Sequence, residues 1–118
     1  MSVWPSAIDY DPSAKSLRVT FDNGDIFALP AEYLRVESPS AEVQGHNPSE
    51  RITVPGRRHV GIIDIEAVGN YAVRLVFDDL HDTGIYSWAF LHQLGREHEA
   101  RWQTYLAALD AKGLSRDP

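Results

Sequence analysis

The chain has 118 residues, 43% of them hydrophobic and 24% charged, which is the size and composition of one globular domain with a sizeable core. Its net charge of −6 argues against nonspecific binding to nucleic acid or anionic membranes, and the absence of cysteine excludes disulfides, thiolate zinc ligands and cysteine nucleophiles. No apolar run reaches the ~20 residues of a membrane span and residues 1–5 do not resemble a signal peptide, so we expect a cytoplasmic protein.

The first predicted unit is a β-hairpin. Residues 1–15 show no hydrophobic period and are interpreted as an irregular lead-in. In residues 17–21 apolar and polar side chains alternate, which predicts a half-buried strand. Asn23-Gly24 follows and favours a tight turn, because both residues tolerate positive φ. We therefore expect a return strand over residues 25–29.

A short helix and a long connection are predicted next. Pro30 can open a helix at its first position, which would carry Tyr33 and Leu34 toward the core. Residues 36–60 are rich in Ser, Pro, Gly, Asn and charged residues. A connection of this length is usually functional or mobile, and a variable surface loop, with a short helix or strand in it, is the plainer alternative.

The second half of the chain predicts another run of antiparallel strands. Residues 62–67 and 71–77 have strand patterns, and residues 68–70 provide the turn between them. Leu75 and Phe77 should be nearly buried. A second turn, at residues 78–82, leads to a short strand over residues 84–87.

Two helices are expected at the C-terminal end. One begins near Trp88, and Gly95 either ends or weakens it. The other covers about residues 96–112, with Gly113 as its C-cap. It carries one apolar stripe at helical spacing: Trp102, Tyr105, Leu106 and Leu109.

A weak internal echo links the two halves. Residues 17–22 align with residues 73–78, and residues 33–34 with residues 90–91. An ancient duplication and two hairpin–helix units obeying the same packing rules account for this equally well. Either way we predict a single α+β domain over residues 1–118: a mostly antiparallel sheet of four to six strands built from hairpins, with short helices and a C-terminal helical segment.

Several unusual strings also occur in a fixed order. They are Leu29-Pro30-Ala31-Glu32-Tyr33-Leu34-Arg35, Ser38-Pro39-Ser40-Ala41-Glu42-Val43-Gln44-Gly45-His46, Gly69-Asn70-Tyr71-Ala72-Val73-Arg74, Phe77-Asp78-Asp79 and His81-Asp82-Thr83-Gly84-Ile85-Tyr86-Ser87-Trp88. Over about residues 10–95 the chain closely resembles the gamma-butyrobetaine hydroxylase-like N-terminal domain family. The resemblance implies an α+β domain that occurs alone in bacteria with unknown function, in front of carnitine-pathway oxygenases, and behind some iron–sulfur carrier ATPases. Because oxygenase chemistry belongs to a separate domain of those relatives, oxygenase activity is not carried over.

The resemblance also bears on zinc. In the oxygenases this domain holds a structural zinc through three cysteines and a histidine, and the matching positions here are Ser38, Ser40, Val43 and His81. Since all three thiolates are missing, we expect no structural zinc.

The turn at residues 78–82 is the first candidate site. It places three carboxylates beside His81, and Asp78, Asp82 and a distant His46 could complete a site for iron or another metal. The plainer alternative is a solvated turn in which aspartates cap backbone amides.

A basic group in the long connection is the second candidate. Arg51, Arg57, Arg58 and His59 could bind an anionic ligand or an acidic partner surface, or they could belong to a solvated loop. Trp88, Phe90 and Trp102 are expected in the core, with a partner-binding face as the alternative for one of them.

No catalytic motif is present. Nucleophile elbows, phosphate-binding glycine loops and dinucleotide fingerprints are missing. We therefore favour a non-catalytic accessory or protein-interaction module with an unknown protein partner, which the resemblance places in an iron–sulfur or metallocofactor context. The alternative is a small metal- or ligand-binding protein that uses His81, Asp82 and His46, and an undetected enzyme is the third hypothesis. Burial of His81 and Asp82 beside His46 would favour metal binding, whereas a flat exposed aromatic patch would favour the interaction module.

Overall fold

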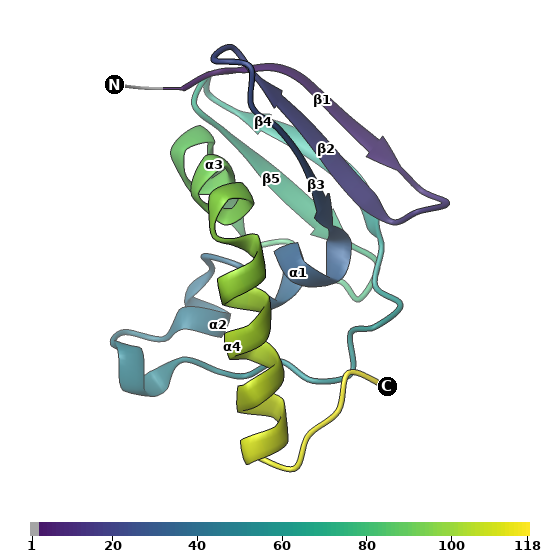
Figure 1. The fold of residues 1–118 in the computed structure, drawn as a ribbon, viewed down its shortest axis with the longest axis vertical. Coiled ribbons are helices and arrows are strands. Elements are labelled where there is room, and N and C mark those ends of the chain that lie inside the picture. Colours follow the sequence, from purple (N-terminus) through teal and green to yellow (C-terminus); the bar gives the residue numbers. More distant parts are fainter. Residues whose placement is uncertain (1–2) are drawn as a thin grey trace.

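The computed structural model describes residues 3–118, which form six strands and four α-helices (Figure 1). The elements are β1 (Pro5–Asp11), β2 (Ser16–Phe21), β3 (Ile26–Pro30), α1 (Ala31–Val36), α2 (Ala41–Gln44), a 3₁₀ turn (Pro48–Glu50), β4 (Ile62–Val68), β5 (Ala72–Phe77), β6 (Ile85–Ser87), α3 (Trp88–Arg96) and α4 (His98–Ala111). The predicted α+β class is confirmed, with the six strands divided between two antiparallel three-stranded sheets. Among the described residues, no helix is long and apolar enough to cross a membrane.

The first sheet has the order β1-β2-β3, so β2 is its central strand. The alternation in β2 is confirmed, because Leu17, Val19 and Phe21 are buried. The hairpin turn to β3 is also confirmed, with one correction: Gly24 has φ +94°, whereas Asn23 does not take a positive φ. The turn therefore needs glycine at one position only.

The irregular lead-in predicted for residues 1–15 is wrong, because Pro5–Asp11 forms β1 and pairs with β2. An edge strand tolerates a proline, since one side of its backbone makes no ladder hydrogen bonds. Ile8 and Tyr10 are only partly buried against the core. The Ile62 N–H donates to the Tyr10 hydroxyl at 3.0 Å, which ties β1 to β4.

The second sheet has the order β4-β5-β6, with β5 in the centre. The predicted burial of Leu75 and Phe77 is confirmed, as both are fully buried. Side chains of both sheets share one core, and its central members are Leu17, Val19, Phe21, Leu29, Val73, Leu75, Phe77 and Tyr86. The two segments of the internal echo thus include the two central strands, an arrangement that either explanation of the echo accommodates.

The helices deviate from prediction at two boundaries. Pro30 is the last residue of β3 and precedes α1 instead of opening it. Gly95 does not end α3, which continues to Arg96, and the break before α4 falls at Glu97. Gly113 follows the C-cap of α4 with φ +65° and confirms the predicted end of that helix.

The connection between α1 and β4 is packed against the C-terminal helix. Figure 1 shows α3 and α4 as one bent arm that passes α1 and α2. A second, smaller core joins these parts, and its members are Val36, Val43, Val54, Tyr105 and Leu109. The Tyr105 hydroxyl donates to the Val54 carbonyl at 2.6 Å. The connection is therefore anchored at its middle, and it contains α2 and the 3₁₀ turn.

Candidate functional site

The turn at residues 78–82 joins β5 to β6 and is held by ion pairs within the chain. One carboxylate oxygen of Asp79 accepts hydrogen bonds from Nε of Arg35 at 2.8 Å and Nε of Arg57 at 2.6 Å. Its other oxygen accepts from the His81 N–H at 3.1 Å. Burial alone would raise the pKa of Asp79, but the His81 N–H and the two guanidiniums hold that pKa below its usual range. Asp79 is therefore a structural anion.

His81 is buried, and both of its ring nitrogens have partners. Nε2 lies 2.9 Å from the Ser38 hydroxyl, and Nδ1 lies 3.1 Å from a carboxylate oxygen of Glu42. Burial, followed by the nearby Arg35 charge, lowers the pKa of His81. The imidazole is therefore neutral at neutral pH and cross-links two distant segments.

The positions that the resemblance matched to zinc ligands lie close to this bond. Ser38 contacts His81 directly, and the hydroxyls of Ser40 and Thr83 are 2.7 Å apart. Val43 is buried in the smaller core instead. Two hydroxyls and a valine therefore occupy the positions at which a zinc site would need thiolates.

The metal-ligand candidates are not gathered into one site. Asp82 is half exposed and pairs with Arg74 at 3.3 Å, whereas Asp78 lies beside Gly61, whose carbonyl accepts its backbone N–H. His46 precedes the 3₁₀ turn, and its backbone N–H donates to Glu50. Within residues 3–118, no three His, Asp or Glu side chains are close enough together to hold a metal ion.

The basic candidates in the long connection bind carboxylates of the chain itself. Arg57 pairs with Asp79, and Arg58 pairs with Asp117 near the C-terminus. The backbone of Arg58 also donates to the Arg116 carbonyl at 3.0 Å. His59 is exposed, and its carbonyl accepts from Lys15. These groups fasten the connection and the C-terminal tail to the fold. Arg57 and His59 line a small cavity of about 180 Å³ beside Asp78, and Arg51 lines a larger one.

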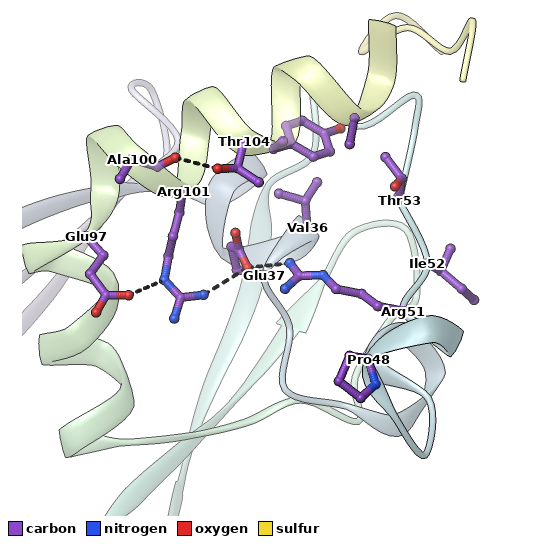
Figure 2. A pocket seen from close by; sticks show the side chains of 12 residues that line it. Val36, Glu37, Pro48, Arg51, Ile52, Thr53, Glu97, Ala100, Arg101 and Thr104 are labelled. Carbon is purple, nitrogen blue, oxygen red and sulfur yellow. Dashed lines mark hydrogen bonds and ion pairs between the residues drawn. The ribbon is translucent and has the colours of Figure 1, made fainter. Parts of the chain in front are cut away.

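That cavity, here called the helix groove, lies between α4 and residues 48–53 and has a volume of about 450 Å³. It is lined by Val36, Glu37, Pro48, Arg51, Ile52, Thr53, Glu97, Ala100, Arg101, Thr104, Tyr105 and Ala108. Figure 2 shows Arg51 and Arg101 reaching from opposite sides to Glu37. The groove therefore combines an aliphatic wall with one charged end.

A second cavity, the aromatic hollow, has a volume of about 570 Å³. It is lined by Val3, Trp4, Tyr71, Ser87, Trp88, Ala89, His92 and Arg96. Trp4 is 47% exposed and Tyr71 57% exposed, although both are large aromatic side chains. Arg96 forms no ion pair with any residue in the described part of the chain.

Neither cavity was predicted as a site from the sequence. Of the residues that line the aromatic hollow, only Trp88 belongs to the set for which the sequence offers a partner-binding face, since Trp4 lies in the predicted lead-in and Tyr71 in a predicted strand. The charge of Arg51 makes it a candidate from the sequence, whereas no sequence pattern links it to its partner Glu37. A sequence signal did exist for the groove, because residues 97, 100, 101, 104 and 108 recur at helical spacing beside the apolar stripe.

The chain is an α+β domain made of two three-stranded antiparallel sheets and a C-terminal helical arm. The model of the family described as gamma-butyrobetaine hydroxylase-like, N-terminal, matches residues 8–92, and the chain belongs to that family. No curated protein matches the chain.

The solved structures that resemble it include the following three. Two are NMR solution structures: one is 45% identical with a TM-score of 0.84, covering 98% of this chain and 90% of the other. The second is 44% identical with a TM-score of 0.86, covering 99% and 87%. The third is a crystal structure of a protein of unknown function from Acidithiobacillus ferrooxidans, assigned to the DUF971 family. It is 35% identical with a TM-score of 0.65, covering 77% of this chain and 91% of that one.

Proposed function

We propose that the chain is a non-catalytic protein-interaction module and that its aromatic hollow binds the partner. The observation that carries this proposal is the exposure of Trp4 and Tyr71 beside Trp88 and Arg96. Trp, Tyr and Arg are the residue types that dominate interaction hot spots. Exposed aromatic surface is otherwise costly for a soluble domain, so a concave cluster of it marks a binding surface.

The hollow is also held in shape before any partner arrives. The Trp88 indole N–H donates to the Asn70 carbonyl at 2.9 Å. Two hydrogen bonds hold the backbone of Trp4 to Asp22. The Asp22 N–H donates to the Trp4 carbonyl at 2.8 Å, and the Trp4 N–H donates to the Asp22 carboxylate at 3.3 Å. A pre-organised surface loses less entropy on binding and therefore supports higher affinity.

The candidate metal ligands do not favour the alternative function. Metal binding would have been favoured by His81 and Asp82 buried beside His46, but Asp82 is half exposed and the three do not form a cluster. A flat exposed aromatic patch would favour the interaction module; the cluster of Trp4, Tyr71 and Trp88 is aromatic and partly exposed but concave, and it supports the proposal through the exposure of its side chains. An iron–sulfur or metallocofactor context for the partner rests on the resemblance to larger relatives.

The proposal is tested by affinity capture from native lysate with quantitative mass spectrometry. The double variant Trp4→Ala with Tyr71→Ala removes the aromatic surface without touching the main core, to which neither side chain belongs. Ile63→Ala is the matched control, because Ile63 is 65% exposed near the opposite end of the β4–β5 hairpin. We expect the double variant to lose a specific partner that the wild type and the control retain. Equal capture by all three proteins would contradict the proposal.

A further inference from the structure

The charged end of the helix groove is built on a buried carboxylate. The Glu37 side chain is 4% exposed, and one of its oxygens accepts from Nη2 of Arg51 at 2.6 Å and Nη1 of Arg101 at 3.3 Å. Nε of Arg101 also donates to Glu97 at 2.8 Å. The Arg51 and Arg101 side chains are 42% and 22% exposed and are therefore more exposed than that of Glu37. A molecule entering the groove therefore meets the guanidiniums before it meets Glu37.

Most hydrogen-bond donors of these guanidiniums are unused. A guanidinium carries five N–H donors, and within the described residues Arg51 donates through Nη2 alone, while Arg101 donates through Nε and Nη1. Glu37 holds both planes in place, so an incoming anion would not have to order them. The carboxylates of Glu37 and Glu97 line the same end of the groove, so this cluster carries two positive and two negative charges, and the unused guanidinium donors are what would favour an anion.

The rest of the groove suits a hydrocarbon chain. Its apolar wall consists of the aliphatic side chains of Val36, Ile52, Ala100 and Ala108 together with the aromatic ring of Tyr105. Ala100 and Ala108 are separated by about 12 Å along the helix, from the rise of α-helical residues. A volume of about 450 Å³ lies within the range of small-molecule sites.

We propose that the helix groove binds a small amphipathic carboxylic acid. Its carboxylate lies against Arg51 and Arg101, and its hydrocarbon body runs along α4 toward Ala108. This site shares no lining residue with the aromatic hollow, so it goes beyond the proposed protein-interaction function and stands or falls independently of it.

The test is a calorimetric and NMR titration of the full chain with octanoate. Octylamine and 1-octanol are the controls, because they keep the hydrocarbon and change the charge of the head. Octanoate is expected to bind saturably, one molecule per chain, and about tenfold or more tighter than either control, since a charge-assisted hydrogen bond distinguishes it. Absence of octanoate binding, or equal binding of all three probes, would overturn the proposal.

Two variants locate the site. Arg51→Gln removes the more exposed guanidinium while Arg101 still holds Glu37, and it should weaken octanoate binding about tenfold. Arg74→Gln is its control, because Arg74 is similarly exposed but pairs with Glu66 on the sheet. Thr104→Trp fills the groove from an exposed position of α4 and should abolish binding without altering the core. Octanoate binding unchanged in both Arg51→Gln and Thr104→Trp would place the ligand elsewhere and refute the assignment.

Discussion

The Ser38 hydroxyl lies 2.9 Å from Nε2 of His81, and both side chains are buried. The contact ties the connection after α1 to the turn between β5 and β6, two segments that are 43 residues apart in the sequence. In the oxygenases that the sequence resembles, the matching positions are zinc ligands. Here a direct hydrogen bond joins them, and the second ring nitrogen of His81 faces Glu42.

The first prediction is that the domain folds without zinc. Structural zinc needs four good ligands because its binding free energy becomes folding free energy, and serine and valine replace the thiolates. Purified protein should contain far less than one zinc per chain by elemental analysis, and a strong chelator should leave the melting temperature unchanged. Stoichiometric zinc that survives dialysis, together with a lower melting temperature in chelator, would contradict this prediction. It would show that other side chains bind zinc in place of the cysteine thiolates.

The second prediction concerns pH and His81. Burial holds the pKa of His81 below its ordinary value of 6.5, so below that pH the unfolded chain takes up a proton that the folded chain resists. The contribution of His81 to the free energy of unfolding is therefore fully present above pH 6.5. It is lost as the pH falls through the lower pKa that His81 has in the folded state. The melting temperature should be lower near pH 5.5 than near pH 7.5.

Histidine variants test whether His81 causes the expected fall in melting temperature at low pH. His81→Gln should reduce the difference between the two melting temperatures, while His59→Gln, at an exposed position, should leave it unchanged. Some dependence should remain, because burial also lowers the pKa of His98. A His81→Gln protein with the full wild-type pH dependence would show that His81 is not responsible.

The third prediction concerns Gly95 in α3. Alanine normally stabilises a helix interior relative to glycine by about 1 kcal/mol. A Cβ at Gly95, however, would overlap the ring of Phe27 from β3. Gly95→Ala should therefore destabilise the protein by about 1–3 kcal/mol, the usual cost of overpacking, as measured by urea unfolding. The sign should reverse in a Phe27→Ala background, and destabilisation of equal size in both backgrounds would exclude the contact as the cause.

The fourth prediction tests the shared core of the two sheets. Phe77 is fully buried in the central strand β5, so Phe77→Ala should cost ~3–5 kcal/mol in the free energy of unfolding. Ile85→Ala in the neighbouring strand should cost far less, because Ile85 is half exposed. Similar losses for both variants would mean that β5 does not organise the core.

The strand patterns over β2 to β6 could be recognised in the sequence, and the clearest patterns belong to the two central strands. β2 and β5 bury alternate side chains completely, which creates a clear period of two. β1 was missed because it is an edge strand: Ile8 and Tyr10 are only partly buried, and Pro5 suggests a break. Its formation depends on pairing with β2, which is a tertiary property.

The cavities depend on contacts between distant parts of the chain, although one helical side of the groove has a recognisable spacing in the sequence. The aromatic hollow combines Trp4, Tyr71 and Trp88, which come from three separate parts of the chain. In the helix groove, Glu37 and Arg101 form an ion pair across 64 residues of sequence. Contacts between such distant residues produce no pattern in the local sequence. The charged candidates that the sequence does indicate, Arg57 and Arg58, form ion pairs within the chain.

The central claim, that a partner protein binds the aromatic hollow, is tested most directly by NMR. Labelled protein would be titrated with the partner identified by capture, and the backbone and indole N–H signals would be followed. We expect the largest shifts to include the indole signals of Trp4 and Trp88 and the amides of Tyr71 and Arg96, and we expect Trp4→Ala with Tyr71→Ala to weaken binding. Shifts confined to other surfaces, with these signals unmoved at saturation, would contradict it.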